Sequence, residues 1–166
     1  IKEVPSDTLI LLTTKAYDSA KALTGIRNLL KNDTVILILQ NGLGNERLVK
    51  RIVGEKMQVL RGLVALGAEF PEPGKITLWK EETILEQTEA SKRIAELLNQ
   101  SELKTKVSND FERELWDKLV VNCVVNPLTA ILKVRDNEIV VDALKEVRSG
   151  IIDECVRVGT AEGKVF

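Results

Sequence analysis

The 166-residue sequence predicts an α/β fold, in which part of a mostly parallel, doubly wound sheet is followed by an all-α region. Over the first 107 residues, short apolar runs bounded by polar residues alternate with helical patterns, which is the order of strands and crossover helices in a parallel sheet. Beyond residue 108, two long helical patterns follow each other with no strand between them. We therefore expect residues 1–107 to belong to a Rossmann-like domain and residues 108–166 to begin a helical domain.

The first strands and helices follow directly from hydrophobic patterning. TLILLT (8–13) and TVILIL (34–39) are apolar runs of strand length, which predicts two fully buried parallel strands. Between them, residues 18–31 carry apolar side chains at helical spacing, and residues 46–53 predict a further helix. The second strand ends in QNGLG (40–44), a glycine-containing turn.

The next segment mixes strands with one helix. Residues 58–67 predict strand and turn, and residues 75–79 and 82–86 alternate in the manner of antiparallel strands. Residues 88–99 predict an amphipathic helix with Ile94, Leu97 and Leu98 facing inward. A short strand at 103–107 completes the α/β part, and residues 139–159 form the second of the two later helical patterns.

The helix expected at 114–130 (ELWDKLVVNCVVNPLTA) carries one polar stripe. Lys118, Asn122, Asn126 and Thr129 fall within an arc of about 80°. The remaining faces are apolar, which predicts a buried helix, and Pro127 removes a backbone donor and predicts a kink beside Asn126. Unpaired buried polar groups cost about 1–3 kcal/mol each. The stripe must therefore meet a partner, which is either another protein layer across a polar seam or a bound substrate, and the residues alone leave both readings open.

Composition narrows the chemistry. A net charge of −1 and 4% aromatic residues argue against nucleic acid and against a polybasic membrane patch. The sequence has neither an apolar run of about 18 residues, which a membrane span needs, nor a secretory signal pattern. Cys123 and Cys155 lie in apolar helical patterns, which predicts buried free thiols in a reducing, cytoplasmic compartment. With no histidine and two cysteines we expect no metal site, so lysine and carboxylates remain for acid–base chemistry.

Two polar residues follow the ends of the predicted parallel strands. Lys15 comes after the first strand and Asn41 after the second. Ligands of open α/β sheets bind beyond the carboxyl ends of the strands, so both residues are candidates for ligand contact. A solvated surface lysine and an ordinary Asn-Gly turn are the alternative readings.

Three motifs carry a family resemblance. The run W-x-K-L-x-x-N-x-x-x-N-P-L-T-A (116–130) resembles the start of the helical domain of ketopantoate reductases, and T-K-A (14–16) and Q-N-G-L-G (40–44) resemble the same family in the same order. The resemblance implies NADPH-dependent reduction of 2-dehydropantoate to pantoate, a step of pantothenate and coenzyme A biosynthesis. The α/β part would then be the C-terminal part of an NADP-binding domain.

The resemblance also implies roles for particular residues. Lys118 would be the catalytic proton donor, in a site whose burial lowers the pKa of the lysine toward neutrality. The cofactor would contact Lys15, Asn41 and Ala68, and the 2-keto acid would contact Asn41, Lys118 and a further set of polar residues: Asn122, Asn126 and Asp136.

Two features depart from the family pattern. Asp136-Asn137-Glu138 stands where the family commonly has Asn-Gly-Glu, so either Asn137 takes over the substrate contact by a one-residue shift or the contact is absent. No G-x-G-x-x-G follows a strand, so we expect a fragment that lacks the phosphate loop and the distal helices. NADH in place of NADPH remains open, because the ribose-reading segment would precede residue 1.

Two further readings stay open on the sequence. The chain could be a non-catalytic binding or dimerisation module on the same scaffold. It could also belong to a related dehydrogenase of another 2-keto or 3-hydroxy acid, because fold alone does not define the substrate. The expected partners are a small 2-keto acid and, as a homodimer, a second copy of the chain; neither nucleic acid nor a membrane is expected.

Overall fold

The computed structural model describes residues 1–65, 67–79, 82–101 and 103–166. The chain divides into two compact units, Ile1–Phe111 and Glu112–Phe166. Each unit has its own hydrophobic cluster, and each is described here by itself.

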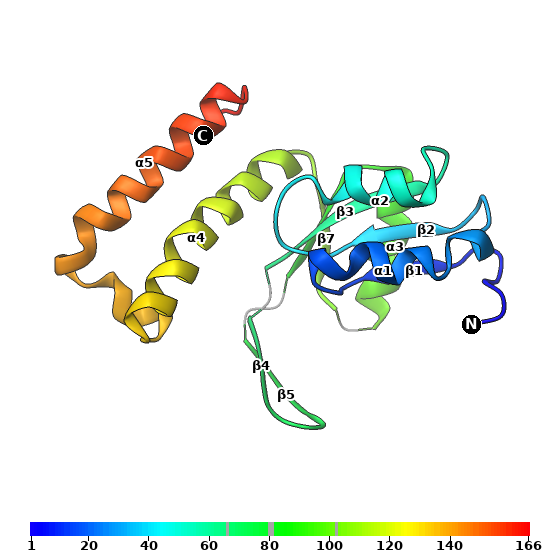
Figure 1. Cartoon of the computed structure of the whole chain (residues 1–166), viewed down its shortest axis with the longest axis horizontal. Coiled ribbons are helices and arrows are strands. Elements are labelled where there is room, and N and C mark those ends of the chain that lie inside the picture. Colours follow the sequence, from blue (N-terminus) through cyan, green and yellow to red (C-terminus); the bar gives the residue numbers. More distant parts are fainter. Residues whose placement is uncertain (66, 80–81, 102) are drawn as a thin grey trace. The chain divides into compact units, whose positions relative to one another are not determined.

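The first unit is built on a five-stranded sheet in the order β1-β2-β3-β6-β7 (Figure 1). Its strands are β1 (Leu9–Leu12), β2 (Val35–Ile38), β3 (Gln58–Val64), β6 (Thr83–Glu86) and β7 (Thr105–Ser108). Strands β1, β2 and β3 run parallel, β6 is antiparallel to β3, and β7 is parallel to β6. The expected mostly parallel sheet is confirmed, with a single antiparallel pairing inside it.

Helices cover both faces of this sheet, as a doubly wound fold requires. They are α1 (Ser19–Thr24), α2 (Asn45–Val53) and α3 (Glu89–Gln100), with two short 3-10 turns, η1 (Ala16–Asp18) and η2 (Arg27–Leu29). Because side chains alternate along a strand, Ile36 and Ile38 of β2 pack with Leu23 of α1 and Val49 of α2, whereas Leu37 packs with Ile94 of α3 on the opposite face. Thr88 begins α3 by accepting a hydrogen bond from the Ser91 backbone N–H at 3.0 Å.

Three sequence expectations about this unit were wrong. Strand β1 is only half-buried, and Leu11 is 42% exposed, because β1 pairs with β2 alone and forms an edge of the described sheet. The helix expected at 18–31 is shorter, since α1 ends at Thr24 and Gly25 separates it from η2. Leu97 is 52% exposed, because the face of α3 that packs on the sheet carries Ile94 and Leu98.

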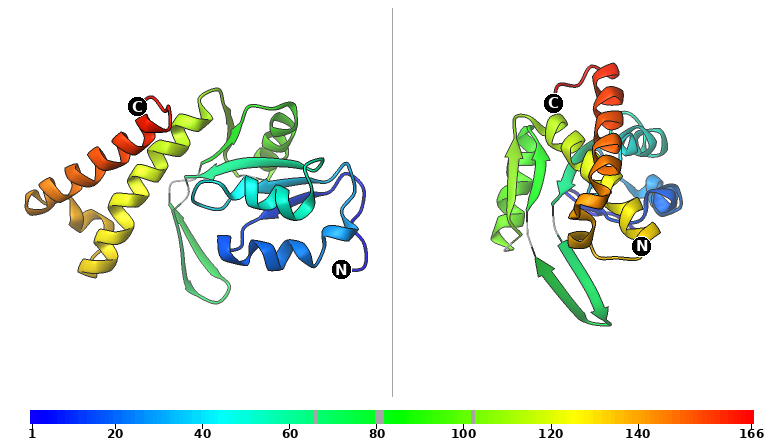
Figure 2. Two further views of the ribbon diagram at one scale, coloured as in Figure 1. Left: turned by 45° about the horizontal axis from the view of Figure 1, so that its top comes forward. Right: turned by 90° about the vertical axis from the view of Figure 1, so that its left-hand side faces the viewer.

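A separate two-stranded hairpin extends from the sheet (Figures 1 and 2). It consists of β4 (Gly67–Glu72) and β5 (Lys75–Trp79), paired antiparallel. The two alternating segments expected at 75–79 and 82–86 are both strands, but they belong to different sheets. The first completes this hairpin, and the second lies in the main sheet as β6 between β3 and β7.

The second unit is a pair of antiparallel helices, α4 (Phe111–Leu132) and α5 (Lys145–Ala161), which lie side by side in Figures 1 and 2. Two 3-10 turns join them, η3 (Asp136–Val140) and η4 (Asp142–Leu144). The helix expected at 139–159 therefore begins later than predicted, since residues 139–144 lie in these turns and between them.

Helix α4 is not the buried helix that its composition predicted. Leu115, Trp116, Val124 and Leu128 are buried, but Val121 is 51% exposed and other apolar side chains of α4 are exposed as well. The reason is that α5 and η3 pack along one side of α4 and leave its other faces uncovered within this unit. Pro127 lies inside the helix, which continues through it to Leu132.

By length and composition, α4 would also suffice to cross a bilayer, with a mean hydropathy of 1.3 over an 18-residue window. The core helix of a soluble protein passes the same test. The composition of α4 therefore does not indicate a membrane location.

The tight packing around Gly62 of β3 leads to a stability prediction. A Cβ at this position would lie 2.6 Å from Leu39 Cδ2 and 3.0 Å from Leu85 Cδ2. We expect Gly62→Ala to lower the free energy of unfolding by about 1–3 kcal/mol, since overpacking a well-packed core displaces its side chains. Urea denaturation followed by circular dichroism measures the change.

Gly25→Ala is the matched control in the same unit. Gly25 has right-handed backbone angles, and a Cβ there would meet backbone oxygens only at 3.8 Å and beyond. We expect this substitution to be neutral or slightly stabilising. Equal loss of stability in both variants would contradict the packing explanation.

Candidate functional site

The carboxyl ends of β1 and β2 bring two of the predicted residues to one edge of the sheet. The strands are parallel and in register from Leu9 opposite Val35 to Leu12 opposite Ile38, so the segments that follow them leave the sheet at the same level. Lys15 and Asn41 lie in these two segments, and both are exposed. The structure thus places both residues at the edge where open α/β sheets bind ligands.

The Gln40 side chain ties these two segments together. Its Nε2 donates to the Thr14 carbonyl at 2.6 Å and lies 2.8 Å from the hydroxyl of Ser19, which is fully buried. One amide thus joins the end of β2 to the residue before Lys15 and to the start of α1. Sequence reasoning missed Gln40 as a positioning residue; its place directly after a buried strand and before Asn41 was the available signal.

A second set of contacts holds the turn that contains Asn41. Arg61 of β3 donates through its guanidinium to the Gly42 carbonyl at 3.4 Å, and its Nε lies 3.2 Å from Glu46 Oε2 of α2. The side chain of Arg61 is 12% exposed and that of Glu46 is 28% exposed, so the pair is shielded from solvent. Gly42 and Gly44 have φ of 99° and 80°, a conformation that glycine adopts without strain.

Ala68 lies in β4, just beyond the carboxyl end of β3. Because β3 is parallel to β1 and β2, its carboxyl end points to the same edge as those of β1 and β2. Ala68 is exposed and pairs with Leu78 across the hairpin. The three residues predicted to approach a cofactor therefore follow three neighbouring parallel strands.

The polar stripe of the second unit lies on α4. Lys118 and Asn122 are half-buried and Asn126 is exposed, so the burial expected for this helix is only partial at Lys118. Within the described residues of the second unit, these three side chains form no hydrogen bond or ion pair with a protein group. The helix pair by itself therefore does not supply partners for the two amides.

Thr129 belongs to the same face but differs in its bonding. Its hydroxyl donates to the carbonyl of Val125 at 2.8 Å and lies 3.2 Å from the Asn126 carbonyl. This bonding to the preceding turn is common for threonine within helices. The outward-facing stripe consequently reduces to Lys118, Asn122 and Asn126.

Asp136 begins η3 at the turn after α4 and is exposed. The nearby Glu138 carboxylate is engaged locally, because its Oε2 accepts from the Arg135 backbone N–H at 2.9 Å. An ionised aspartate at position 136 only accepts hydrogen bonds and repels a carboxylate. Neither Asp136 nor Asn137 gains a ligand-binding role from this geometry.

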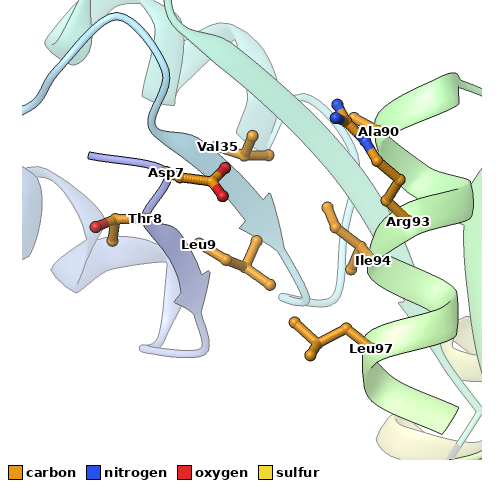
Figure 3. A pocket seen from close by; sticks show the side chains of 8 residues that line it. All are labelled: Asp7, Thr8, Leu9, Val35, Ala90, Arg93, Ile94 and Leu97. Carbon is orange, nitrogen blue, oxygen red and sulfur yellow. The ribbon is translucent and has the colours of Figure 1, made fainter. Parts of the chain in front are cut away.

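A cavity of about 200 Å³ lies elsewhere in the first unit (Figure 3). Asp7, Thr8, Leu9 and Val35 line it from the starts of β1 and β2, and α3 lines it from the other side. This is the amino end of the parallel strands, opposite to the edge that carries Lys15 and Asn41. The cavity is therefore separate from the predicted site.

Fold and sequence together place the chain among Rossmann-like proteins that carry a helical domain after the sheet. The sequence model described as "Ketopantoate reductase PanE/ApbA" matches residues 3–88, and the one described as "Ketopantoate reductase PanE/ApbA C terminal" matches residues 110–166. The chain belongs to the ketopantoate reductase family.

Curated relatives agree with this assignment. The chain is 30% identical over 166 residues to the 2-dehydropantoate 2-reductase of Pyrococcus horikoshii, covering 95% of the chain and 54% of the relative. It is 32% identical over 163 residues to that of Streptococcus pyogenes serotype M3, covering 93% and 52%. The chain thus spans about half the length of the curated relatives it matches.

Solved structures share the fold. A D-mandelate dehydrogenase in a ternary structure with NADH and anilino(oxo)acetate is similar with a TM-score of 0.85 and 27% identity, over 98% of this chain and 54% of that one. A 2-dehydropantoate 2-reductase from Geobacter metallireducens GS-15 is similar with a TM-score of 0.79 and 30% identity, over 92% and 52%.

The shielded Arg61–Glu46 pair leads to a prediction about the turn. Arg61→Met removes the donors to Glu46 and to the Gly42 carbonyl and leaves a shielded carboxylate unpaired. We expect a loss of about 1–3 kcal/mol in the free energy of unfolding and faster amide hydrogen exchange at residues 41–44. Urea denaturation and hydrogen exchange followed by mass spectrometry measure the two effects.

Lys75→Met provides the control. Lys75 pairs with Glu72 at 3.1 Å, but both side chains are more than 60% exposed. Exposed pairs contribute about 0–1 kcal/mol, so we expect little change in stability and none in exchange at residues 41–44. Unchanged exchange at the turn in Arg61→Met would show that Arg61 does not hold it.

Proposed function

We propose that the protein reduces a 2-keto acid, 2-dehydropantoate, to its 2-hydroxy acid with NADPH as the hydride donor. The observation that carries the proposal is the stripe of Lys118, Asn122 and Asn126, which has no partner within the described residues of its own unit, in a chain that belongs to the ketopantoate reductase family. The relatives named 2-dehydropantoate 2-reductase, at 30–32% identity, support this choice of substrate. Nothing in these comparisons favours a non-catalytic binding module.

The proposal divides the work between two domains. Residues 1–107 are the C-terminal part of an NADP-binding domain, and residues 108–166 begin the substrate domain. The dinucleotide supplies a hydride when bound. On this chain, the residues that suit its nicotinamide end are Lys15, Asn41 and Ala68, which all follow carboxyl ends of parallel strands. A Cβ at Gly42 or Gly44 would have no neighbour within 4 Å, so the turn beside Asn41 leaves space for a ligand.

Lys118 is the proton donor in this proposal. As the carbonyl carbon of the keto acid receives a hydride, its oxygen gains negative charge, which an ammonium group stabilises before it transfers a proton. The chain contains no histidine, so lysine is the cationic acid available on this helix face. Half-burial of Lys118 restricts its side chain, which favours a defined position for the proton.

Asn122 and Asn126 orient the substrate. Each lies one helical turn beyond the previous member of the stripe, so the two amides offer donors and acceptors along about 12 Å of helix starting at Lys118. We assign them to the hydroxyl and carboxylate end of the substrate, and Asn41 to contacts with both the nicotinamide and the substrate. Asp136 remains a substrate-contact candidate, either directly or through a shift to Asn137.

A second substrate is favoured by one observation. The similar structure with 27% identity is a D-mandelate dehydrogenase described with NADH. Steady-state kinetics with a panel of 2-keto acids identifies the substrate. The same assay with NADPH and with NADH identifies the preferred cofactor. Faster turnover of benzoylformate than of 2-dehydropantoate would assign the protein to this second reaction.

A homodimer belongs to the same proposal. Sedimentation equilibrium of the full-length protein measures the assembly directly. A monomer at all concentrations tested would remove this part of the proposal and leave the assigned reaction untouched.

The role of Lys118 makes a kinetic prediction. In the full-length protein, we expect Lys118→Ala to lower kcat for 2-dehydropantoate by about 100- to 10,000-fold, because a positioned general acid contributes that much to the rate. Oxidation of NADPH followed by absorbance measures kcat, and circular dichroism establishes that the variant is folded. Lys145→Ala, at the exposed start of α5, is the matched control and is expected to retain full activity. A folded Lys118→Ala variant with near-normal kcat would refute the role.

Asn126 makes a different prediction. We expect Asn126→Ala to raise KM, and to lower kcat as well if the contact strengthens in the transition state. Asn126→Asp keeps the shape but replaces the amide donor by a negative charge, so KM for a carboxylate substrate should rise further than in the alanine variant. An equal KM in wild type and both variants would remove Asn126 from the substrate site.

A further inference from the structure

The two cysteines of the chain face each other across the helix pair of the second unit. Cys123 lies on α4 and Cys155 on α5, and both are half-buried free thiols. Burial raises the pKa of the Cys155 thiol, and the neighbouring Cys123 thiol raises that pKa further.

Independent contacts along α4 and α5 establish this register. At one end of the helix pair, Trp116 packs against Phe166 with ring centroids 6.0 Å apart. Gly159 lies against these two rings, and a Cβ at that position would clash with Phe166. At the other end, Ile151 packs in the cluster that contains Val124 and Leu128.

Cys155 lies between these two anchors. It is four residues from Ile151 and four from Gly159, so all three share the face of α5 that packs against α4. On α4, Cys123 comes seven residues after Trp116, so the two share the face of α4 that packs near Gly159 and Phe166. The helix packing therefore holds the thiols together without any contribution from the thiols themselves.

Cys123 lies outside the polar stripe. On an α-helix it is about 140° around the axis from Lys118 and about 60° from Asn126, the nearest member of the stripe. Among the described residues there is no cluster of three or more histidine, cysteine or acidic side chains that could hold a metal ion. The chemistry available to the pair is therefore that of a dithiol.

We propose that Cys123 and Cys155 form a reversible disulfide that links α4 to α5 when the protein meets a disulfide oxidant such as glutathione disulfide. In the first step, one cysteine thiolate attacks glutathione disulfide, forms a mixed disulfide and releases one glutathione thiolate. In the second step, the thiolate of the other cysteine attacks the protein sulfur and releases the second glutathione. Overall, the two protein thiols lose two electrons and two protons, and one glutathione disulfide takes up both to become two molecules of reduced glutathione.

The bond would close a loop that contains η3, η4 and the first turns of α5. A disulfide that closes such a loop restricts the unfolded chain, and the native helix packing already brings the sulfurs together. The link would hold α4 and α5 together through a face of α4 that lies about 60° around the helix axis from Asn126 and about 140° from Lys118. This proposal does not depend on the proposed enzymatic reaction, since its readout is covalent.

Peptide mapping tests the proposal. Trypsin cleavage at lysine and arginine places Cys123 in peptide 119–133 and Cys155 in peptide 149–157. After incubation of the protein with glutathione disulfide and alkylation of the remaining thiols, we expect a linked peptide pair whose mass is lower by two hydrogens than the sum of the two. Dithiothreitol should return both peptides to the free form.

Single variants provide the controls. Cys155→Ser should leave Cys123 as a stable mixed disulfide with glutathione, and Cys123→Ser should do the same for Cys155. Oxidised wild-type protein should melt several degrees above reduced wild type, whereas the variants should show no such rise.

Mixed disulfides on both cysteines of the wild type, or links only between separate molecules, would overturn the proposal. Peptide mapping of the wild-type protein distinguishes these outcomes, so the test does not depend on whether a serine variant folds.

Discussion

The parallel backbone pairing of β1 with β2 is the constraint on which the rest of the first unit depends. Because the two strands run in the same direction and in register, their carboxyl ends terminate together, and the segments that follow must leave the sheet at one edge. Gln40 then links these segments through the Thr14 carbonyl and the buried Ser19 hydroxyl. The positions of Lys15 and Asn41 are consequences of strand direction, made rigid by one amide side chain.

In the second unit, packing and chemistry occupy different faces of the same helix. The face of α4 that carries Trp116, Val124 and Leu128 is buried, and the hydrophobic area removed from water there stabilises the helix pair. That packing leaves the stripe of Lys118 and the two asparagines without protein partners among the described residues of this unit. A helix held by one face can present polar groups on another, because its backbone hydrogen bonds are satisfied internally.

Several site contacts could not be derived from sequence patterns. Arg61 and Glu46 look like ordinary surface charges in the sequence, yet they form a shielded pair that also supports the Gly42 carbonyl. In the sequence, Gln40 looks like an ordinary turn residue, but in the structure its amide links the segments that follow β1 and β2. Each contact joins residues at least 15 positions apart, so no local periodicity reports it.

Sequence alone determined the type and order of most elements, because apolar runs and helical periodicity reflect which side chains must leave water. It also located Lys118, Asn122 and Asn126 on one helix face, since helical geometry fixes their spacing. Only the tertiary structure decided how far α4 is covered within its unit, that β1 pairs with β2 alone among the described strands, and that residues 82–86 join the main sheet. Only the tertiary structure brought Cys123 to Cys155. These features depend on which segments pack together, and a local pattern records that a face is apolar without recording what covers it.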